Sequence, residues 1–152
     1  MIRIFNLFFI IFFLLSAKAY SLIEIDITRG NLDPLPIAVS PLFQDDNSKR
    51  NSINELKIEN VGSEISLVVE NNLKISGLFN PLSKEAFLQK PDIAHLKPRF
   101  EDWALIKAQA LITGKVTIED KKLKVEFRLW DILAGREMMA LAFTTVPSNW
   151  RR

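Results

Sequence analysis

The chain has 152 residues, with 20 Lys and Arg against 18 Asp and Glu, and its formal net charge at pH 7 is +2. Arg3 and Lys18 lie in the first nineteen residues, so the other 18 basic residues balance the 18 acidic ones. A domain without net charge lacks the basic excess that is typical of nucleic-acid-binding proteins, so we expect no nucleic-acid partner. The sequence contains no Cys, which excludes a disulfide scaffold, a thiol nucleophile and a Cys-ligated metal.

The first nineteen residues have the three parts of a cleavable secretory signal. Arg3 supplies the positive charge, residues 4–15 form the apolar stretch, and small residues follow it. The predicted cleavage site consists of Ala17, Ala19 and Tyr20. The alternative is an uncleaved anchor, but a spanning helix needs about 20 consecutive apolar residues and this run is much shorter. We therefore expect export, with one mature domain over residues 20–152.

The segment just after the predicted cleavage site alternates between apolar and polar side chains, as a half-buried strand does. Ile23, Ile25 and Ile27 share one face, and Glu24 and Asp26 lie on the other. From the residues alone, this segment is either the first strand of the domain's own sheet or a strand that waits for a partner.

Two prolines and a polar stretch shape the next part of the chain. Residues 33–36, Asp-Pro-Leu-Pro, predict a stiff turn, because each proline fixes its φ angle and lacks an N–H donor. Residues 37–39 predict a short buried strand that stops before Pro41. The polar stretch from Gln44 to Asn54 predicts a surface loop.

The apolar period then changes to three or four residues, which predicts an amphipathic helix. Its apolar stripe consists of Ile58, Val61, Ile65, Val68 or Val69, and Leu73. Two starts fit the pattern: Glu55 with a kink at Gly62, or Ser63. Gly77 is well placed to end the helix, since glycine accepts the left-handed conformation.

The second half of the chain is richer in strands. An extended segment at 79–82 and a helical turn at 84–88 precede a helix at 100–107. Three strands follow in series, at residues 110–119, 123–132 and 137–146. The connections between them are short, which forces antiparallel hairpins.

The middle strand of these three has the clearest alternation in the sequence. Its predicted core face consists of Leu123, Val125, Phe127 and Leu129. The other face carries charged side chains and Trp130. We expect Trp130 to lie against a neighbouring helix or a partner, because a large aromatic side chain is poorly placed in open water.

Patterns for catalysis are weak. His95 is the one His of the chain, and without a second His or a Cys it has no partner for a metal shell or a nucleophile dyad. The five glycines are too dispersed for a phosphate-binding loop. The pairs Asp45-Asp46 and Glu101-Asp102 are adjacent in sequence, so their side chains diverge. We expect no enzymatic activity, no metal, no cofactor and no small-molecule substrate.

Five segments carry a resemblance to a known family. They are IDITRG at 25–30, PLPIAV at 34–39, SGLFNPL at 76–82, Trp103 with QALITGKV at 109–116, and VEFRLWD at 125–131. On these residues the mature chain resembles the amino-terminal domain of the TolB family, the periplasmic component of the Tol-Pal envelope system. The resemblance implies an α/β fold, a mixed β-sheet covered by two or more α-helices.

In the family this domain precedes a six-bladed β-propeller that contacts the lipoprotein Pal. Residues 147–152 look like the start of a helix, and we expect the chain to be the front part of something longer. Pal is expected as a partner only where a propeller is supplied. Trp130 and Phe143 are candidates for the face that would meet the propeller.

The resemblance also implies a periplasmic location, a role in outer-membrane integrity and cell division, and binding of TolA by the mature amino terminus. The expected partner-binding residues are Tyr20, Leu22, Ile23, Glu24, Ile25, Asp26, Ile27 and Arg29. Physical chemistry agrees, because an unpaired strand can add to another protein's sheet. The alternatives are a non-functional truncated fragment and an unrelated exported binding domain.

Overall fold

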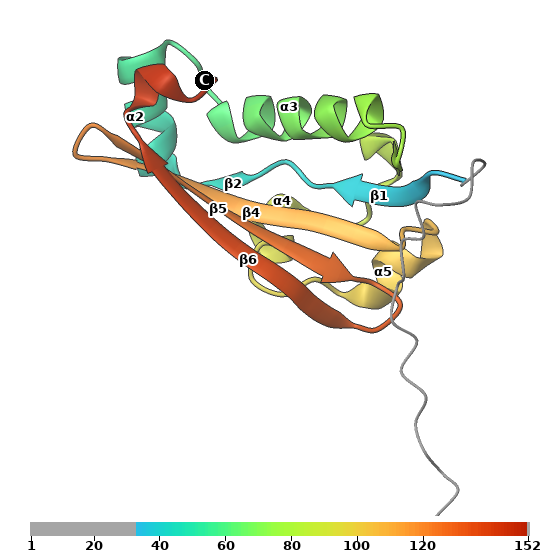
Figure 1. Cartoon of the computed structure of the whole chain (residues 1–152). Coiled ribbons are helices and arrows are strands. Elements are labelled where there is room, and N and C mark those ends of the chain that lie inside the picture. The colour runs from blue at the N-terminus through green and yellow to red at the C-terminus, as the bar shows by residue number, and fades with distance from the viewer. Residues whose placement is uncertain (1–32, 152) are drawn as a thin grey trace, which may run out of the picture.

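The computed structural model describes residues 33–151. The predicted signal segment, its cleavage site and the first predicted strand lie outside the described residues. The described part is a mixed sheet with helices on both faces, α3 on one and α4 and α5 on the other (Figure 1). This arrangement confirms the predicted fold class.

The sheet has six strands in the order β3-β1-β4-β5-β6, and β2 pairs with β4 beside β1. The strands are β1 Leu35–Val39, β2 Phe43–Gln44, β3 Phe79–Pro81, β4 Ala110–Glu119, β5 Lys122–Asp131 and β6 Arg136–Thr145. The pairings of β1 with β3, of β1 with β4 and of β2 with β4 are parallel. In contrast, β4, β5 and β6 form the predicted antiparallel hairpins. The strand boundaries in this second group lie within one residue of the predicted ones.

The expected stiff turn at residues 33–36 is wrong in its second half, because β1 already begins at Leu35. The backbone N–H of Leu35 donates to the carbonyl of Leu78 over 2.9 Å. Pro36 contributes through its carbonyl, which accepts from Gln109 N over 3.0 Å. A proline is tolerated near the start of a strand where its missing donor is not needed.

The expected surface loop over Gln44–Asn54 is also wrong, because this stretch forms β2 and helix α2, Asp46–Leu56. The helix buries Ser48 and Ser52 instead of an apolar stripe. Ser48 Oγ accepts from Ile118 N over 3.1 Å, and the Ser52 hydroxyl donates to the Ile58 carbonyl over 2.6 Å. Hydropathy misses a helix whose buried contacts are hydrogen bonds between small polar groups and backbone.

Helix α3, Val61–Ile75, is the predicted amphipathic helix, and it starts at neither of the two expected residues. Asn60 caps it, because its side-chain oxygen accepts from Ser63 N over 3.0 Å. Gly62 lies in the first turn against the Leu42 carbonyl, where a β-carbon would come within 2.4 Å of the oxygen. The helix ends before Gly77, which has a φ of +71° as predicted.

The remaining helical segments are short. They are η1 Lys84–Ala86, α4 Pro91–Ala94, α5 Phe100–Leu105 and η2 Pro147–Asn149. The predicted helical turn at 84–88 is confirmed by η1. The predicted helix at 100–107 is confirmed by α5, which ends two residues earlier. In α5, Glu101 and Asp102 lie in the first turn, where negative charge suits the helix dipole.

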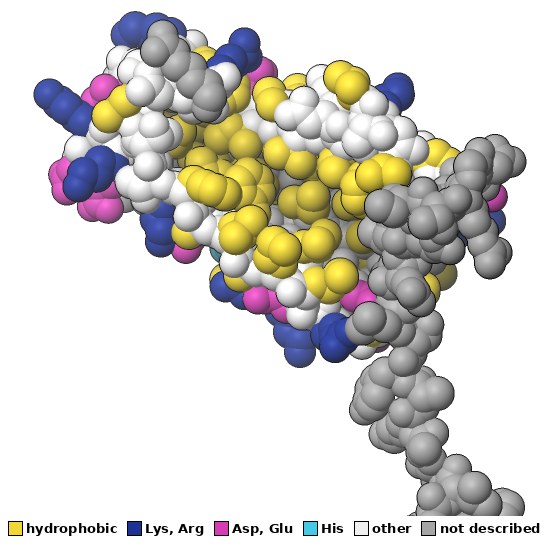
Figure 2. Space-filling model, in the orientation of Figure 1, with side chains coloured by type: hydrophobic (Ala, Val, Ile, Leu, Met, Phe, Trp, Pro, Cys, Tyr) yellow, Lys and Arg dark blue, Asp and Glu magenta, His cyan; other side chains and the backbone are white. Residues whose placement is uncertain are grey.

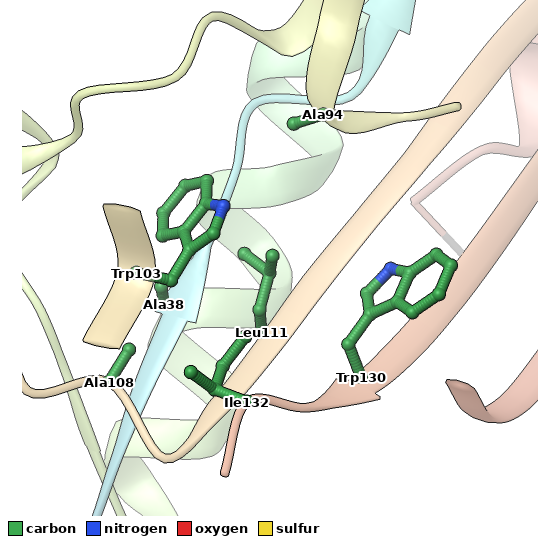
Figure 3. Packing of buried hydrophobic residues seen from close by; sticks show 7 residues of the cluster. All are labelled: Ala38, Ala94, Trp103, Ala108, Leu111, Trp130 and Ile132. Carbon is green, nitrogen blue, oxygen red and sulfur yellow. The ribbon is translucent and has the colours of Figure 1, made fainter. Parts of the chain in front are cut away.

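Two hydrophobic cores lie on opposite faces of the sheet. One contains Leu42, Val61, Ile65, Val116, Ile118, Leu123 and Val125 under α3. The other contains Ala38, Ala94, Trp103, Ala108, Leu111, Trp130 and Ile132 (Figure 3). Successive residues of a strand point to opposite faces of the sheet. In β5, Leu123 and Val125 therefore lie in the first core, whereas Trp130 lies in the second. The predicted core face of β5 is confirmed for Leu123 and Val125.

Trp130 is only 6% exposed and packs edge-on against Phe100 of α5, with ring centroids 5.9 Å apart. Its indole N–H donates to Thr113 Oγ1 over 2.8 Å. The expectation that it lies against a neighbouring helix is confirmed. Its proposed place on a face toward a propeller is wrong, because the domain's own second core covers it.

Candidate interaction surface

An apolar hollow of the described surface lies between α3 and the strands β4, β5 and β6. We call it the apolar groove, and it is lined by Val69, Ile112, Phe127, Arg128, Leu129, Met139 and Leu141, around about 240 Å³. It exists because α3 packs mainly against β3, β1, β2 and β4, and its buried residues are Val61, Gly62, Ile65 and Ser66. The outer strands β5 and β6 therefore extend beyond the cover that α3 provides (Figure 1).

A second hollow continues the apolar groove toward the end of β6. It is lined by Ile65, Leu123, Val125, Phe127, Phe143, Thr144, Thr145 and Trp150. Phe143 is 57% exposed and meets Phe127 edge-on, with centroids 6.3 Å apart. Figure 2 shows the resulting hydrophobic area on this face of the molecule. A contiguous apolar area of this kind is typical of an interaction site on a soluble domain.

Among the residues of this surface, Phe143 was predicted as an interaction residue from the sequence, whereas Met139 and Leu141 were not. The alternation of Met139, Leu141 and Phe143 with small residues in β6 is the sequence signal for them. The cleavage-site residues and the partner-binding residues from Tyr20 to Arg29 lie outside the described residues.

Two of the residues considered for catalysis, His95 and Asp102, make contacts with neighbouring side chains and backbone. His95 stacks on Phe43, with centroids 4.2 Å apart and planes inclined by 7°, and its Nδ1 lies 3.0 Å from the Pro91 carbonyl oxygen. Asp102 forms an ion pair with Arg99 over 2.6 Å. Among residues 33–151, no group of three or more His, Cys, Asp or Glu is placed to hold a metal ion. Within the same range, every helix is too short or too polar to span a membrane.

Asp45 is the N-cap of α2, and its carboxylate accepts from Ser48 N over 2.7 Å. This backbone hydrogen bond lowers the pKa of Asp45 below its usual value of 3.8, although partial burial opposes the shift. Lys115, 3.7 Å from the other carboxylate oxygen, lowers the pKa further. The charged form therefore stabilises the fold above the unfolded pKa, and that stabilisation is lost as the pH falls through the folded one.

Asp45→Ala is expected to lower the free energy of unfolding by about 1 kcal/mol at pH 7, because it removes the cap. Asp45→Asn keeps a capping oxygen but loses the charge. Its deficit relative to wild type is expected to shrink between pH 7 and pH 3, where the wild-type carboxylate becomes protonated. Urea unfolding at both pH values measures the difference. A deficit that is equal at both pH values would contradict the role of the charge.

The fold and the groove together define a mixed α/β domain with an exposed apolar surface. The family model for the TolB amino-terminal domain matches residues 23–138 of this chain. The chain is 73% identical over 144 residues to a Pelagibacter ubique protein named Tol-Pal system protein TolB. That match covers 95% of this chain and 32% of the relative, so the chain spans about a third of the relative's length.

Solved structures support the same fold. TolB from Acinetobacter baumannii superposes with a TM-score of 0.55 at 17% identity, over 78% of this chain and 25% of that one. Lipoprotein GNA1162 from Neisseria meningitidis superposes with a TM-score of 0.53 at 17% identity, over 74% of this chain and 81% of that one. The chain belongs to the TolB amino-terminal domain family, as the family model shows over most of its length.

Proposed function

We propose that this chain is a periplasmic component of the Tol-Pal system and that its mature amino-terminal segment, residues 20–29, binds TolA. In this role it helps to maintain outer-membrane integrity and assists envelope constriction during cell division. The observation that carries the proposal is the 73% identity to a protein named for the Tol-Pal system. The proposal is for a binding role without catalysis.

The chemistry of the segment supports binding by strand addition. Ile23, Ile25 and Ile27 alternate with Glu24 and Asp26, so an extended segment would present one apolar and one acidic face. In strand addition, main-chain hydrogen bonds supply affinity and alternate side chains supply selectivity. The apolar face would contact the TolA domain, and the acidic face would stay in water.

The described fold explains why this segment can be tested separately. Asp33 and Pro34, which precede β1, are both exposed. Within residues 33–151, both cores are formed by segments that follow Pro34 in the sequence. We therefore expect the domain to keep its thermal unfolding transition when residues 20–29 are deleted. A Pal-binding role is proposed only for a protein that carries a propeller as well.

Titration calorimetry with the carboxy-terminal domain of TolA tests the proposal. Deleting residues 20–29 is expected to abolish binding. Ile25→Asp is expected to weaken it more than tenfold, because burying one Ile side chain contributes about 1.5–3 kcal/mol and each 1.4 kcal/mol changes affinity tenfold. The matched control is Leu105→Asp, which places the same charge at an exposed apolar position of α5 and should leave binding unchanged.

Two results would contradict the proposal. If the deleted chain bound TolA as tightly as the full chain, the segment would not be the binding element. If Ile25→Asp removed the thermal unfolding transition, the segment would be a core strand of the domain's own sheet. Failure of the intact chain to bind TolA at all would favour the alternative of a non-functional fragment.

A further inference from the structure

Helix α2 lies beside the end of β4, at the place where β2 stops (Figure 1). The pairing of β2 with β4 reaches only as far as Lys115 and Val116. The next backbone groups on this side of β4 belong to Ile118, and α2 bonds to both of them. Ile118 N donates to Ser48 Oγ over 3.1 Å, and the Ile118 carbonyl accepts from Asn51 Nδ2 over 2.7 Å. Two side chains of a helix therefore take the place of a neighbouring strand.

These two bonds turn the backbone of Ile118 away from β5. In an antiparallel ladder, both backbone groups of one residue point to the same side, and those of the next residue point to the other side. Ile118 lies opposite Leu123, and the alternation directs the backbone groups of its neighbours Thr117 and Glu119 toward β5. The backbone of Ile118 is thus bonded to α2, although its side chain is 2% exposed and belongs to the core under α3.

The contact between α2 and the rest of the domain is small and polar. The helix has two large apolar residues, of which Ile53 is 46% exposed and Leu56 packs partly against the core under α3. The Ser52 hydroxyl bonds to the Ile58 carbonyl, only six residues away in the chain. A hollow of about 310 Å³, lined mostly by polar residues, remains between α2 and the end of β4. An element with so few buried apolar contacts has low local stability.

Both ends of α2 are weakly held as well. At its start, Asp45 forms an ion pair with Lys115 over 3.7 Å, and such a partly exposed pair contributes little. At its end, Lys57 has a φ of +57°, a left-handed conformation that is costly for a residue with a β-carbon. With 11 residues, α2 is also shorter than a helix that is stable by itself in water. We therefore expect α2 to unfold when its contacts with β4 break.

We propose that residues 45–57 form an edge cover, a segment that opens as one unit while the rest of the domain stays folded. In the closed state, Ser48 and Asn51 hold the outward backbone groups of Ile118. In the open state, α2 is unfolded and both groups of Ile118 face water. The cores can keep their packing, because Leu56 is the residue of this segment that packs against a core. This inference goes beyond the binding role proposed for residues 20–29.

Native-state amide hydrogen exchange, followed by NMR at low urea concentrations, tests the opening. The amides of α2 and of Ile118 are expected to exchange through one shared opening with a small urea dependence, because little surface is exposed. The amides of Thr113 and Thr117, which the ladder directs toward β5, are expected to exchange only by global unfolding, with a steep dependence. If α2 and Ile118 had the same exchange free energy and urea dependence as Thr113, the proposal would be overturned.

Ser48→Ala and Ser66→Ala form a matched pair of variants. Both serines are buried, and the Ser66 hydroxyl donates to the Ser63 carbonyl over 2.7 Å, within α3. Ser48→Ala leaves Ile118 N without an acceptor in the closed state, so exchange of the α2 amides is expected to be about tenfold faster. Ser66→Ala is expected to leave this exchange unchanged, because α2 opens without α3. Equal acceleration by both variants would show that α2 opens only with the whole domain.

Lys57→Gly is expected to have the opposite effect. Glycine adopts the left-handed conformation without the cost of a β-carbon, so the closed state is favoured and the α2 amides should exchange about fivefold more slowly. The control is Lys107→Gly, because Lys107 has a φ of +62° and follows α5, outside the edge cover. It should leave α2 exchange unchanged. An equal effect of both variants, or none from Lys57→Gly, would contradict the proposal. These measurements need no TolA, so their failure would leave the proposed function untouched.

Discussion

Gly114→Ala is expected to destabilise the domain by about 3 kcal/mol or more, which is the upper range for overpacking a well-packed interior. Gly114 lies in the middle of β4, buried against its neighbours. A β-carbon there would come within 2.1 Å of the Glu126 carbonyl oxygen and 3.0 Å of Leu42 Cδ2. The backbone of β5 would have to move, because the first contact is with backbone and not with a flexible side chain.

Such a movement would reach the apolar groove, because Phe127, Arg128 and Leu129 of β5 line it. Small domains have a free energy of unfolding of about 5–15 kcal/mol, so this single methyl group would remove a large fraction of it. Chemical unfolding at pH 7, monitored by circular dichroism, measures the loss.

The control is Gly77→Ala, at the end of α3. There φ is +71° and a β-carbon would have no neighbour within 4 Å. The expected loss is about 1 kcal/mol, from backbone strain alone. A Gly114→Ala variant as stable as Gly77→Ala would show that β4 and β5 are not packed as closely as described.

Trp103→Ala is expected to lower the free energy of unfolding by about 3–5 kcal/mol, as truncation of a large core aromatic does. Trp103 belongs to α5, is 1% exposed and is part of the hydrophobic core (Figure 3). Phe87 packs edge-on against it, with centroids 5.0 Å apart. Its indole N–H donates to Gln89 Oε1 over 3.0 Å, and the same oxygen accepts from Arg99 N.

Trp103→Phe separates packing from hydrogen bonding. The aromatic ring is kept, and the Gln89 oxygen retains Arg99 N as a donor, so the expected loss is only about 1–2 kcal/mol. The matched control is Leu105→Ala in the same helix, an exposed position where the change should stay within about 0.5 kcal/mol. Thermal unfolding of the three variants compares them. Equal losses for Trp103→Ala and Leu105→Ala would contradict the assignment of Trp103 to the core.

The second half of the fold was predictable because its signals are local. β4, β5 and β6 alternate with period two and are joined by short connections, so each boundary can be read from a few neighbouring residues. Gly77 and the acidic start of α5 are local signals as well. Helix α2 was not predictable in this way, because its buried residues are serines. Ser48 bonds to Ile118, which is distant in the sequence, and Ser52 bonds to the backbone carbonyl of Ile58. Neither contact produces an apolar pattern in the sequence of the helix.

The apolar groove could not be predicted from the sequence for the same reason. Val69, Ile112, Phe127 and Leu141 come from four different elements, and each reads in the sequence as an ordinary core residue. They remain accessible because α3 packs mainly against β1, β2, β3 and β4 and leaves β5 and β6 less covered. At its first turn α3 approaches Leu42 closely because Gly62 has no side chain, and a β-carbon there would lie 2.4 Å from the Leu42 carbonyl oxygen.

The sequence by itself determined the family resemblance, the neutral charge, the absence of Cys, and the alternating segment at residues 20–29 on which the TolA proposal stands. These are properties of composition and of neighbouring residues. Only the tertiary structure decided that Trp130 is core, that Gln44–Asn54 is largely helical, and that β6 is the last strand of the sheet formed by residues 33–151. Each of these depends on which distant segment lies beside a residue, and strand order and helix cover are set by packing across the whole domain.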